Sequence, residues 1–253
     1  MSLFLKNLVL KKLTITKKSS GGKNFYGRTS VYHRELGHKK KYRFIDFFRI
    51  IREVPGKVRR LEYDPNRSAF VALVCYKNSV LAYCIAAEGL KVGSIVISGI
   101  SNSYSIGSSS LISNAPIGSY VFNLEYFPGF GGKVSRAAGS FCQILKKFNE
   151  KYILVRMKSK EFRIFYQHNF VTYGVVSNSF KKFEKLYKAG QSRWRGVRPI
   201  VRGEAKNPVD HPHGGNTSGG RHPVTPWGKL TRGVRTRRLR NSNIGFIVKS
   251  RYK

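Results

Sequence analysis

The side chains best suited to chemistry lie in one stretch near the end of the chain. It reads Asn207-Pro-Val-Asp-His-Pro-His-Gly-Gly215 and is followed by Arg221-His-Pro-Val-Thr-Pro-Trp-Gly-Lys229. Four of its side chains are of the types that ligate metals: Asp210, His211, His213 and His222. Imidazole and carboxylate ligands could hold a metal ion and activate water, which would make this a metal-dependent hydrolase acting on RNA.

Two other interpretations compete with the metal site. His211 beside Asp210, together with Ser218, could support nucleophilic chemistry. Alternatively the stretch is an ordered loop that contacts RNA, its path fixed by prolines and its close packing allowed by glycines. An enzyme site needs a rigid apolar scaffold, which the surrounding sequence does not supply. Arginines flank the stretch on both sides and favour the RNA-contacting loop: Arg193, Arg195, Arg198, Arg202, Arg232, Arg235, Arg237, Arg238 and Arg240.

A second segment, Pro128-Gly-Phe-Gly-Gly-Lys-Val-Ser135, superficially resembles a phosphate-binding loop. It lacks the glycine five residues before Gly132, and Val134 occupies the Ser/Thr position after the lysine. We therefore expect no nucleotide site here. We interpret the segment as a barrel loop whose Lys133 and Arg136 face RNA backbone.

Trp194 lies between Arg193 and Arg195. This arrangement is suited to stacking on an unpaired base beside phosphate contacts. Packing of the tail against the second of two predicted barrels explains the tryptophan equally well, so both interpretations stay open.

The charge of the chain indicates a polyanionic partner. The 253 residues contain 48 Lys and Arg against 12 Asp and Glu, a formal net charge of +36. Self-repulsion at this charge opposes compaction unless a polyanion neutralises it. Hydrophobic residues make up 41% of the sequence, enough for a folded core. No apolar run is long enough to span a bilayer and no lipidation signal is present, so we expect no membrane association.

The basic charge concentrates at the two ends. Residues 1–43 hold 12 Lys and Arg and one acid, and residues 190–253 hold 15 and two, so these 107 residues carry two-thirds of the net charge. The last segment also contains ten glycines and five of the nine prolines. Such a segment cannot build its own core and should take its shape from a partner. The cysteines, Cys75, Cys84 and Cys142, have no Cys-x-x-Cys spacing, and we interpret them as buried small hydrophobes.

The middle of the chain predicts β structure. Ala69–Tyr76 and Val80–Ile85 form a candidate hairpin around a polar turn, because apolar residues occupy both faces of short runs. Further candidate strands are 92–98, 119–126, 140–146, 152–157, 161–167 and 171–177. Short strands at this spacing favour small barrels. One helix is predicted over Ser179–Ala189, capped by Ser179 and ended by Gly190.

Several stretches closely resemble the universal large-subunit ribosomal protein 2 family, in its bacterial or organellar form. They are Ser20-Gly-Gly-Lys-Asn-Phe-Tyr-Gly-Arg28, Gly37-His-Lys-Lys-Lys-Tyr-Arg43, Arg60-Leu-Glu-Tyr-Asp-Pro-Asn-Arg-Ser68, Arg193-Trp-Arg-Gly-Val-Arg-Pro199, and the His-Pro-His and Pro-Trp-Gly-Lys segments already quoted. They occur in family order and cover nearly the whole chain.

The resemblance implies a mainly β chain: an OB-fold domain followed by an SH3-like barrel, with extended basic N- and C-terminal tails. We place a basic N-terminal extension at 1–43, the OB-fold at 44–115, the SH3-like barrel with its short helix at 116–189, and the rRNA-threading tail at 190–253. The family binds large-subunit rRNA, helps the subunits associate, and supports tRNA placement and the peptidyl-transferase region, where the catalyst is RNA. His211 matches the histidine closest to that function, as an RNA-contacting support residue.

The residue patterns and the resemblance together predict a structural constituent of the large ribosomal subunit and no enzyme. Expected partners are large-subunit rRNA, neighbouring ribosomal proteins and the small subunit across an intersubunit bridge; we expect no cofactor, metal, catalytic residue or small-molecule substrate. An RNA chaperone or translation factor outside the ribosome is the alternative. The predicted rRNA-contacting side chains are Lys23, Arg28, His38, Lys39, Lys40, Lys41, Arg43, Arg60, Asn66, Arg67, Lys133, Arg136, Arg193, Trp194, Arg195, Arg198, Arg202, Asn207, Asp210, His211, His213, Arg221, His222, Trp227, Lys229, Arg232, Arg235, Arg237 and Arg238.

Some positions depart from the family pattern. Lys206 stands where the family usually has Met, and Gly215 leads directly into Asn216 where a longer Gly/Glu/Gly/Arg stretch is usual. These departures and the bias towards Lys, Phe, Tyr and Ser favour a divergent organellar protein. We expect a mitochondrial ribosome, with a plastid or an AT-rich bacterium as alternatives.

Overall fold

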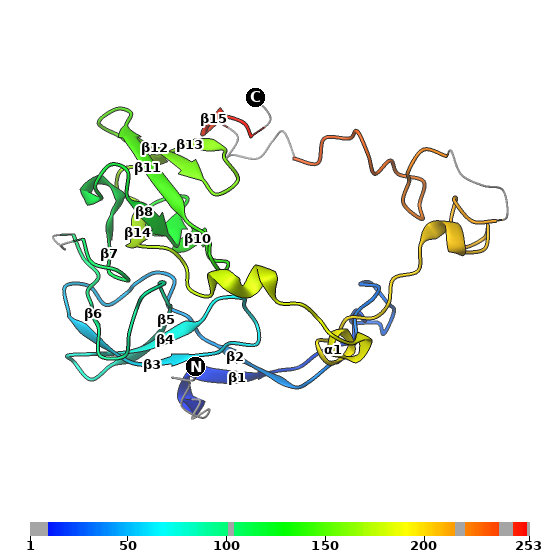
Figure 1. Cartoon of the computed structure of the whole chain (residues 1–253), viewed down its shortest axis with the longest axis horizontal. Coiled ribbons are helices and arrows are strands. Elements are labelled where there is room, and N and C mark those ends of the chain that lie inside the picture. Colours follow the sequence, from blue (N-terminus) through cyan, green and yellow to red (C-terminus); the bar gives the residue numbers. More distant parts are fainter. Residues whose placement is uncertain (1–9, 101–103, 216–220, 238–244, 252–253) are drawn as a thin grey trace. The chain divides into compact units, whose positions relative to one another are not determined.

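The computed structural model describes residues 10–100, 104–215, 221–237 and 245–251. The described residues divide into two compact units, which are drawn in Figure 1. Unit 1 comprises residues 10–17, 40–100, 104–185 and 245–251, and unit 2 comprises residues 18–39, 186–215 and 221–237. Each unit is therefore assembled from segments that lie far apart in the sequence.

Short β-strands make up most of the regular structure. The strands are β1 (Thr14–Lys17), β2 (Lys40–Arg43), β3 (Gly56–Glu62), β4 (Val71–Tyr76), β5 (Leu81–Ile85), β6 (Ile95–Val96), β7 (Ser109–Leu111), β8 (Tyr120–Phe122), β9 (Leu124–Glu125), β10 (Gly132–Val134), β11 (Cys142–Lys147), β12 (Tyr152–Met157), β13 (Phe162–Tyr166), β14 (Phe170–Tyr173) and β15 (Ile247–Lys249). Within the described ranges the helical segments are the 3-10 turns η1 (Lys11–Leu13), η2 (Ile112–Asn114), η3 (Ser179–Phe183) and η4 (Gly203–Ala205), and one α-helix, α1 (Ala189–Trp194).

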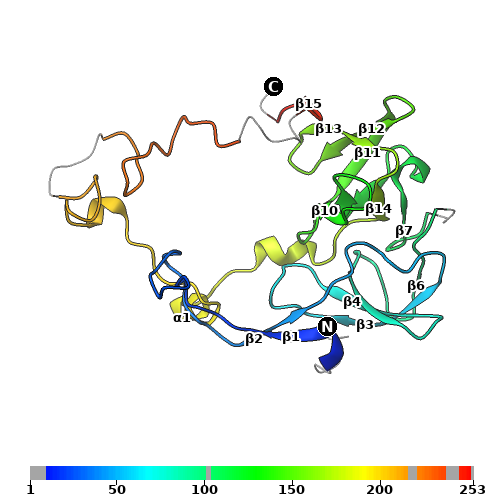
Figure 2. The ribbon, with the colours of Figure 1, turned by 180° about the vertical axis from the view of Figure 1, so that it is seen from behind.

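The first barrel is built on a four-stranded antiparallel sheet in the order β5-β4-β3-β6, of which β3, β4 and β6 are labelled in Figure 2. Alternation along β4 sends Ala72, Val74 and Tyr76 into one cluster with Val58, and Val71 and Leu73 into another with Tyr83. Because both faces of β4 are covered, its sequence is a continuous run of apolar residues. A register shift between Val58 and Arg60 bends β3, which a small closed barrel requires. This barrel is the OB-fold.

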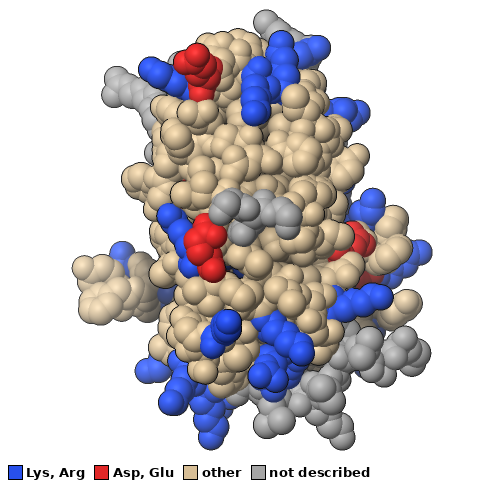
Figure 3. Space-filling view, turned by 90° about the vertical axis from the view of Figure 1, so that its left-hand side faces the viewer, with Lys and Arg blue, Asp and Glu red and all other residues tan. Residues whose placement is uncertain are grey.

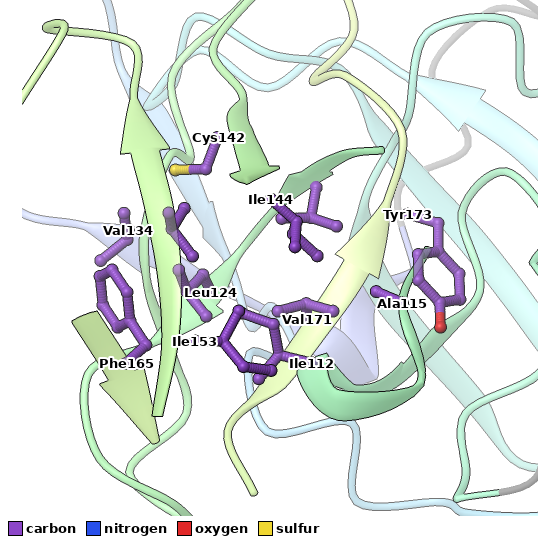
Figure 4. Packing of buried hydrophobic residues seen from close by; sticks show 12 residues of the cluster. Ile112, Ala115, Leu124, Val134, Cys142, Ile144, Ile153, Phe165, Val171 and Tyr173 are labelled. Atoms are coloured by element: carbon purple, nitrogen blue, oxygen red, sulfur yellow. The ribbon is translucent and has the colours of Figure 1, made fainter. Parts of the chain in front are cut away.

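The second barrel has seven strands in the order β15-β13-β12-β11-β8-β14-β7. Figure 4 shows its core, in which Leu124, Ile144, Ile153 and Val171 converge from different strands and Ile112 joins them from η2. The pairing register places Cys142 opposite both Val121 and Met157, with its side chain fully buried. This barrel is SH3-like, and β15 closes its edge from the end of the chain.

Contacts between the two barrels hold unit 1 together. Ala87 pairs with Val176 in an isolated antiparallel bridge, and both lie in a buried cluster with Phe122. Ser68 joins the barrels by hydrogen bonds, since its hydroxyl accepts from the Ala138 amide at 3.0 Å and its carbonyl accepts from Asn178 Nδ2 at 2.7 Å. The loop before Ser68 is thus fixed by both barrels.

The prediction of a mainly β chain with an OB-fold followed by an SH3-like barrel is confirmed, while the domain boundaries stay predictions. The predicted strands over 152–157 and in the β4–β5 hairpin match the structure closely. Strands β3 and β10 were missed, and β7 lies in a segment interpreted as a connection. Because β10 pairs with β9, the Pro128–Ser135 segment is partly strand. The alternation of apolar and polar residues that predicts a strand is hidden in β3 by its lysine and arginines and in β10 by its glycine.

The predicted helix over Ser179–Ala189 is wrong. A 3-10 turn covers only Ser179–Phe183, and the α-helix begins at Ala189. The Ser179 hydroxyl donates to Glu88 Oε1 at 2.7 Å and makes no helix cap. Four lysines at helical spacing would also repel one another along this segment, with Glu184 as the single acid among them. Among the described residues no helix has the length and apolar character needed to cross a membrane.

Candidate nucleic-acid interface

A buried ion network in unit 1 organises the Arg60–Ser68 segment. The Glu62 carboxylate accepts from Arg43 Nε at 3.2 Å, and its Oε1 lies 3.0 Å from Arg60 Nη2. The Tyr83 hydroxyl donates to the same carboxylate at 3.0 Å. Burial, then the charge of Glu62, raises the pKa of Tyr83. The carboxylate is therefore held by several donors, as a buried charge requires.

Asp64 completes this network and shapes the loop that follows. Its side chain is fully buried, with Oδ2 2.6 Å from Arg67 Nε and Oδ1 accepting from the Asn66 amide at 2.9 Å. Asn66 Nδ2 reaches across to the Lys41 carbonyl at 2.6 Å. Arg43 is only 3% exposed, so its side chain lies in the protein interior. This burial disfavours its predicted contact with rRNA. Arg60, Asn66 and Arg67 remain partly exposed at the rim of the network.

Lys133 and Arg136 lie beside exposed and half-buried aromatic rings of unit 1. Lys133 is exposed between the buried residues Gly132 and Val134, and its Nζ lies 5.6 Å from the centroid of the Phe130 ring. The Arg136 guanidinium lies 4.7 Å from the Phe47 ring centroid. Both side chains are therefore exposed at the surface, and their contact with RNA backbone stays a prediction.

A basic hollow on the OB-fold was missed by the sequence analysis. It has a volume of about 350 Å³ and includes Lys57, Arg59 and Lys77 in its lining, with Tyr76 and Ile95 as apolar walls. Lys57 and Arg59 are exposed and alternate along β3 with the buried residues Gly56 and Val58. That alternation was the signal that could have identified both the strand and its basic outer face.

Unit 2 joins the N-terminal segment to the Arg193–Pro199 stretch. The Glu35 amide donates to the Gly196 carbonyl at 2.9 Å, and the His38 amide donates to the Trp194 carbonyl at 2.9 Å. In the opposite direction the Arg198 amide donates to the His33 carbonyl at 3.0 Å. Two predicted RNA-contacting segments, about 160 residues apart in sequence, are thus brought together.

Two glycines allow this close approach. Gly37 has φ +62°, and a Cβ atom on it would lie 2.7 Å from the Gly196 nitrogen. Gly196 has φ +83°, and a Cβ there would lie 2.8 Å from the Glu35 carbonyl oxygen. Neither position accepts a side chain without moving backbone.

The acidic residue of this junction, Glu35, interacts with arginines of the same unit. Glu35 Oε1 accepts from Arg193 Nη2 at 2.9 Å and lies 3.7 Å from Arg198 Nη1. Trp194, on α1, is 57% exposed, with Lys188 Nζ 4.8 Å from its ring centroid. The indole therefore presents much of its surface to a partner, while its two flanking arginines and Arg198 retain exposed surface.

The histidine loop folds tightly around His211. The His211 amide donates to the Asn207 carbonyl at 3.2 Å, and the His213 amide donates to His211 Nδ1 at 3.0 Å. A Cβ on Gly203 would lie 2.6 Å from the His211 ring, and one on Gly214 would lie 2.3 Å from the Asn207 carbonyl oxygen. His211 is only 8% exposed, whereas Asp210 is exposed.

The electrostatics of this loop favour a neutral His211. Burial, and then the nearby charges of His213 and Lys206, lower its pKa below the usual 6.5. The hydrogen bond accepted by Nδ1 also requires an unprotonated atom there, which leaves the proton on Nε2. Among the described residues no group of three His, Cys, Asp or Glu side chains is arranged to hold a metal ion.

The rest of the predicted surface lies in exposed segments. His213 Nε2 accepts from the Val224 amide at 3.2 Å, and Arg221 Nη1 donates to the Pro212 carbonyl at 2.6 Å, so the histidine loop and the Arg221–Lys229 segment pack together. Trp227 is 71% exposed. Arg238 lies outside the described residues. The other predicted side chains at exposed positions are Lys23, Arg28, His38, Lys39, Lys41, Arg202, Asn207, His222, Lys229, Arg232, Arg235 and Arg237, while Lys40 is partly buried.

Basic side chains are more numerous than acidic ones on the visible surface. In the view of Figure 3, Lys and Arg clearly outnumber Asp and Glu. Two small barrels carrying a basic surface, with basic segments that have little core of their own, define a nucleic-acid-binding protein. Exposed arginines, aromatic rings and close-packed glycine turns are suited to phosphates and unpaired bases of folded RNA.

Comparison with known proteins identifies the family. The model for the RNA-binding N-terminal domain of ribosomal proteins L2 matches residues 10–98, and the model for their C-terminal domain matches residues 105–228. Large ribosomal subunit protein uL2 of Wolbachia pipientis wMel is 49% identical over 241 residues, covering 94% of this chain and 87% of the relative. The uL2 of Azorhizobium caulinodans is 48% identical over 247 residues, covering 96% and 88%. The uL2m protein of Reclinomonas americana is 46% identical over 255 residues, covering 100% and 92%.

The chain belongs to the ribosomal protein L2 family. It is a structural, RNA-binding protein of the large ribosomal subunit, as the sequence analysis predicted.

The junction of unit 2 gives a first testable prediction. Gly37→Ala should disrupt the hydrogen bonds from Glu35 and His38, because its Cβ would collide with the Gly196 backbone. The matched control is Gly27→Ala, where φ is also positive but nothing lies within 4 Å of the added carbon. Hydrogen exchange measured by NMR should show faster exchange of the Glu35 and His38 amides in Gly37→Ala only. Equal protection of these amides in both variants would contradict the assignment.

The histidine loop gives a second prediction, on pH. Because the pKa of folded His211 is lowered, its contribution to stability is present above about pH 6.5 and is lost as pH falls through that value towards the folded pKa. An NMR titration of the His211 imidazole in the full chain should give a midpoint below 6.5. Lys206→Gln should raise this midpoint, since it removes a neighbouring positive charge. A His211 midpoint at or above 6.5 in the wild type would refute this description of the loop.

Proposed function

We propose that the two barrels anchor folded large-subunit rRNA while the basic segments of unit 2 thread into it. In this role the chain supports subunit association, tRNA placement and the peptidyl-transferase region. Its partners there are rRNA, neighbouring ribosomal proteins and the small subunit across an intersubunit bridge. The chain catalyses no reaction of its own, and the chemistry of peptide-bond formation belongs to RNA.

The junction between residues 33–38 and 194–198 carries this proposal. It holds two highly basic segments together with backbone hydrogen bonds and one shared carboxylate, Glu35, instead of a hydrophobic core. A junction of this kind fixes the backbone of the two segments but buries little apolar surface. The positive charge of the surrounding arginines must therefore be neutralised by a partner. Folded RNA provides phosphates at the density that this arrangement requires.

His211 has a supporting role in the proposal. Its buried, neutral imidazole fixes the turn of the histidine loop by accepting from the His213 amide. The exposed side chains around it, among them Asn207 and His222, then contact RNA from a defined backbone. This role requires no proton transfer by His211.

We propose a mitochondrial ribosome as the location. The similarity to a protein named uL2m over the whole chain supports it, as does the bias towards Lys, Phe, Tyr and Ser. The uL2 protein of the bacterium Wolbachia is 49% identical to this chain, against 46% for uL2m, so a bacterial ribosome is the competing location. Immunogold labelling of the source cells distinguishes the two.

A role as an RNA chaperone outside the ribosome is the second candidate function. The basic, core-poor segments of unit 2 would favour it if they bound RNA of any structure equally. Competition between large-subunit rRNA and unrelated RNA of equal length separates the two candidates, because only the ribosomal role requires preference for the folded rRNA.

Binding should depend strongly on salt. Each neutralised phosphate adds roughly 0.7–0.9 to the slope of the logarithm of affinity against the logarithm of salt concentration. Arg198→Gln should weaken binding of the full chain to large-subunit rRNA and reduce the slope by about that amount, whereas Arg198→Lys should retain the slope. Titrations at several salt concentrations measure this.

Cys142→Ser provides the folding control, since this side chain is fully buried in the second barrel. It should lower stability and leave the salt slope unchanged. Affinity that stays constant across a wide range of salt would refute the electrostatic basis of the proposal.

A further inference from the structure

A tight turn in the N-terminal part of unit 2 presents two aromatic rings to solvent. The Gly27 amide donates to the Asn24 carbonyl at 3.1 Å, which closes the turn Asn24-Phe25-Tyr26-Gly27. The Asn24 amide donates to the Arg28 carbonyl at 2.8 Å, and the Arg28 amide donates to Asn24 Oδ1 at 2.9 Å. Gly27 has φ +76°, a conformation that glycine adopts readily. The backbone of the turn is therefore well defined.

The two rings at its tip are among the most exposed large apolar side chains of the described chain. Phe25 is 97% exposed and Tyr26 is 82% exposed. Their centroids lie 5.5 Å apart, with an angle of 82° between the ring planes. Rings so nearly perpendicular cannot stack on the same flat ligand, so each offers its face to a different one. A rigid turn that places its apolar side chains in water has a structure suited to a partner.

The charge around the turn identifies the partner as an anion. Lys23 and Arg28 flank the rings, and both are exposed. The single acid between residues 18 and 39 is Glu35, which is engaged by Arg193 and Arg198. An anion that also presents flat aromatic faces is a nucleic acid. Double-helical RNA stacks its bases against one another, so the accessible faces belong to unpaired bases.

We propose that Phe25 and Tyr26 form a stacking platform for two unpaired bases of large-subunit rRNA, with Lys23 and Arg28 contacting the phosphates beside them. This inference rests on the proposed function, since it names the RNA element that one part of the surface binds. The sequence analysis identified only the two flanking cations. Aromatic rings that extend fully into solvent from a hydrogen-bonded turn became evident only in the structure.

Ultraviolet cross-linking of isolated large subunits tests the contact directly. Trypsin cuts after Lys23 and Arg28, so the platform is released as the peptide Asn24–Arg28. Mass spectrometry should find a nucleotide adduct on this peptide, with fragmentation locating it on Phe25 or Tyr26. Adducts on other peptides of this chain, with none on this one, would overturn the platform. Absence of the chain from the particles would instead overturn the proposed function.

A variant separates stacking from simple apolar contact. The double substitution Phe25→Leu with Tyr26→Leu keeps the charge and much of the apolar surface but removes both ring faces. Affinity of the full chain for large-subunit rRNA should fall about ten-fold or more, because base stacking on an aromatic ring contributes directly to the affinity. The salt slope should not change, since no cation is lost. Phe25→Tyr with Tyr26→Phe should restore the affinity.

Phe148→Leu is the matched control. Phe148 is 46% exposed, lies 5.8 Å from Lys146 Nζ at the β11–β12 turn of unit 1, and should be neutral for rRNA affinity. An undiminished affinity of the double leucine variant would overturn the proposal, as would an equal loss in Phe148→Leu. Binding to vesicles of phosphatidylcholine and phosphatidylserine that is lost in the double variant, with unchanged RNA affinity, would assign the turn to lipid instead. Retained protection of the Arg28 amide verifies that the turn stays folded.

Discussion

Repulsion among 48 basic side chains is the constraint on which the rest of this structure depends. A chain with 12 acids cannot neutralise itself, so it must separate its like charges or bind a polyanion. The two barrels gather enough apolar residues to fold, whereas unit 2 is held by hydrogen bonds and close glycine contacts. Unit 2 therefore has the greater need for a polyanion that neutralises its charge.

Four of the twelve acids, Glu35, Glu62, Asp64 and Glu125, organise the protein through contacts within it. Glu62 and Asp64 bind arginines inside the OB-fold, and Glu35 joins the two segments of unit 2. Glu125, buried in the second barrel, accepts from the Gly131 amide at 2.9 Å and the Phe170 amide at 3.0 Å. Because these carboxylates are engaged internally, most of the surface cations stay available to RNA.

Sequence reasoning identified the fold class and most of the exposed cations, because apolar alternation and charge are local signals. It missed β3, whose outward residues Lys57 and Arg59 conceal the buried ones, and it placed a helix over Ser179–Ala189 that lysine repulsion and the Ser179–Glu88 bond prevent. It also assigned Arg43 to RNA, although two distant carboxylates bury it. Partners far apart in sequence decide whether a charge such as that of Arg43 faces inward or outward, and a local pattern does not show those partners.

Sedimentation of cell or organelle lysate through sucrose gradients in high salt tests the central claim most directly. The account predicts that the chain stays with large subunits and intact ribosomes, because barrels and threaded segments together anchor it in folded rRNA. Recovery of the chain in light fractions, away from rRNA, while other large-subunit proteins remain bound would contradict the account.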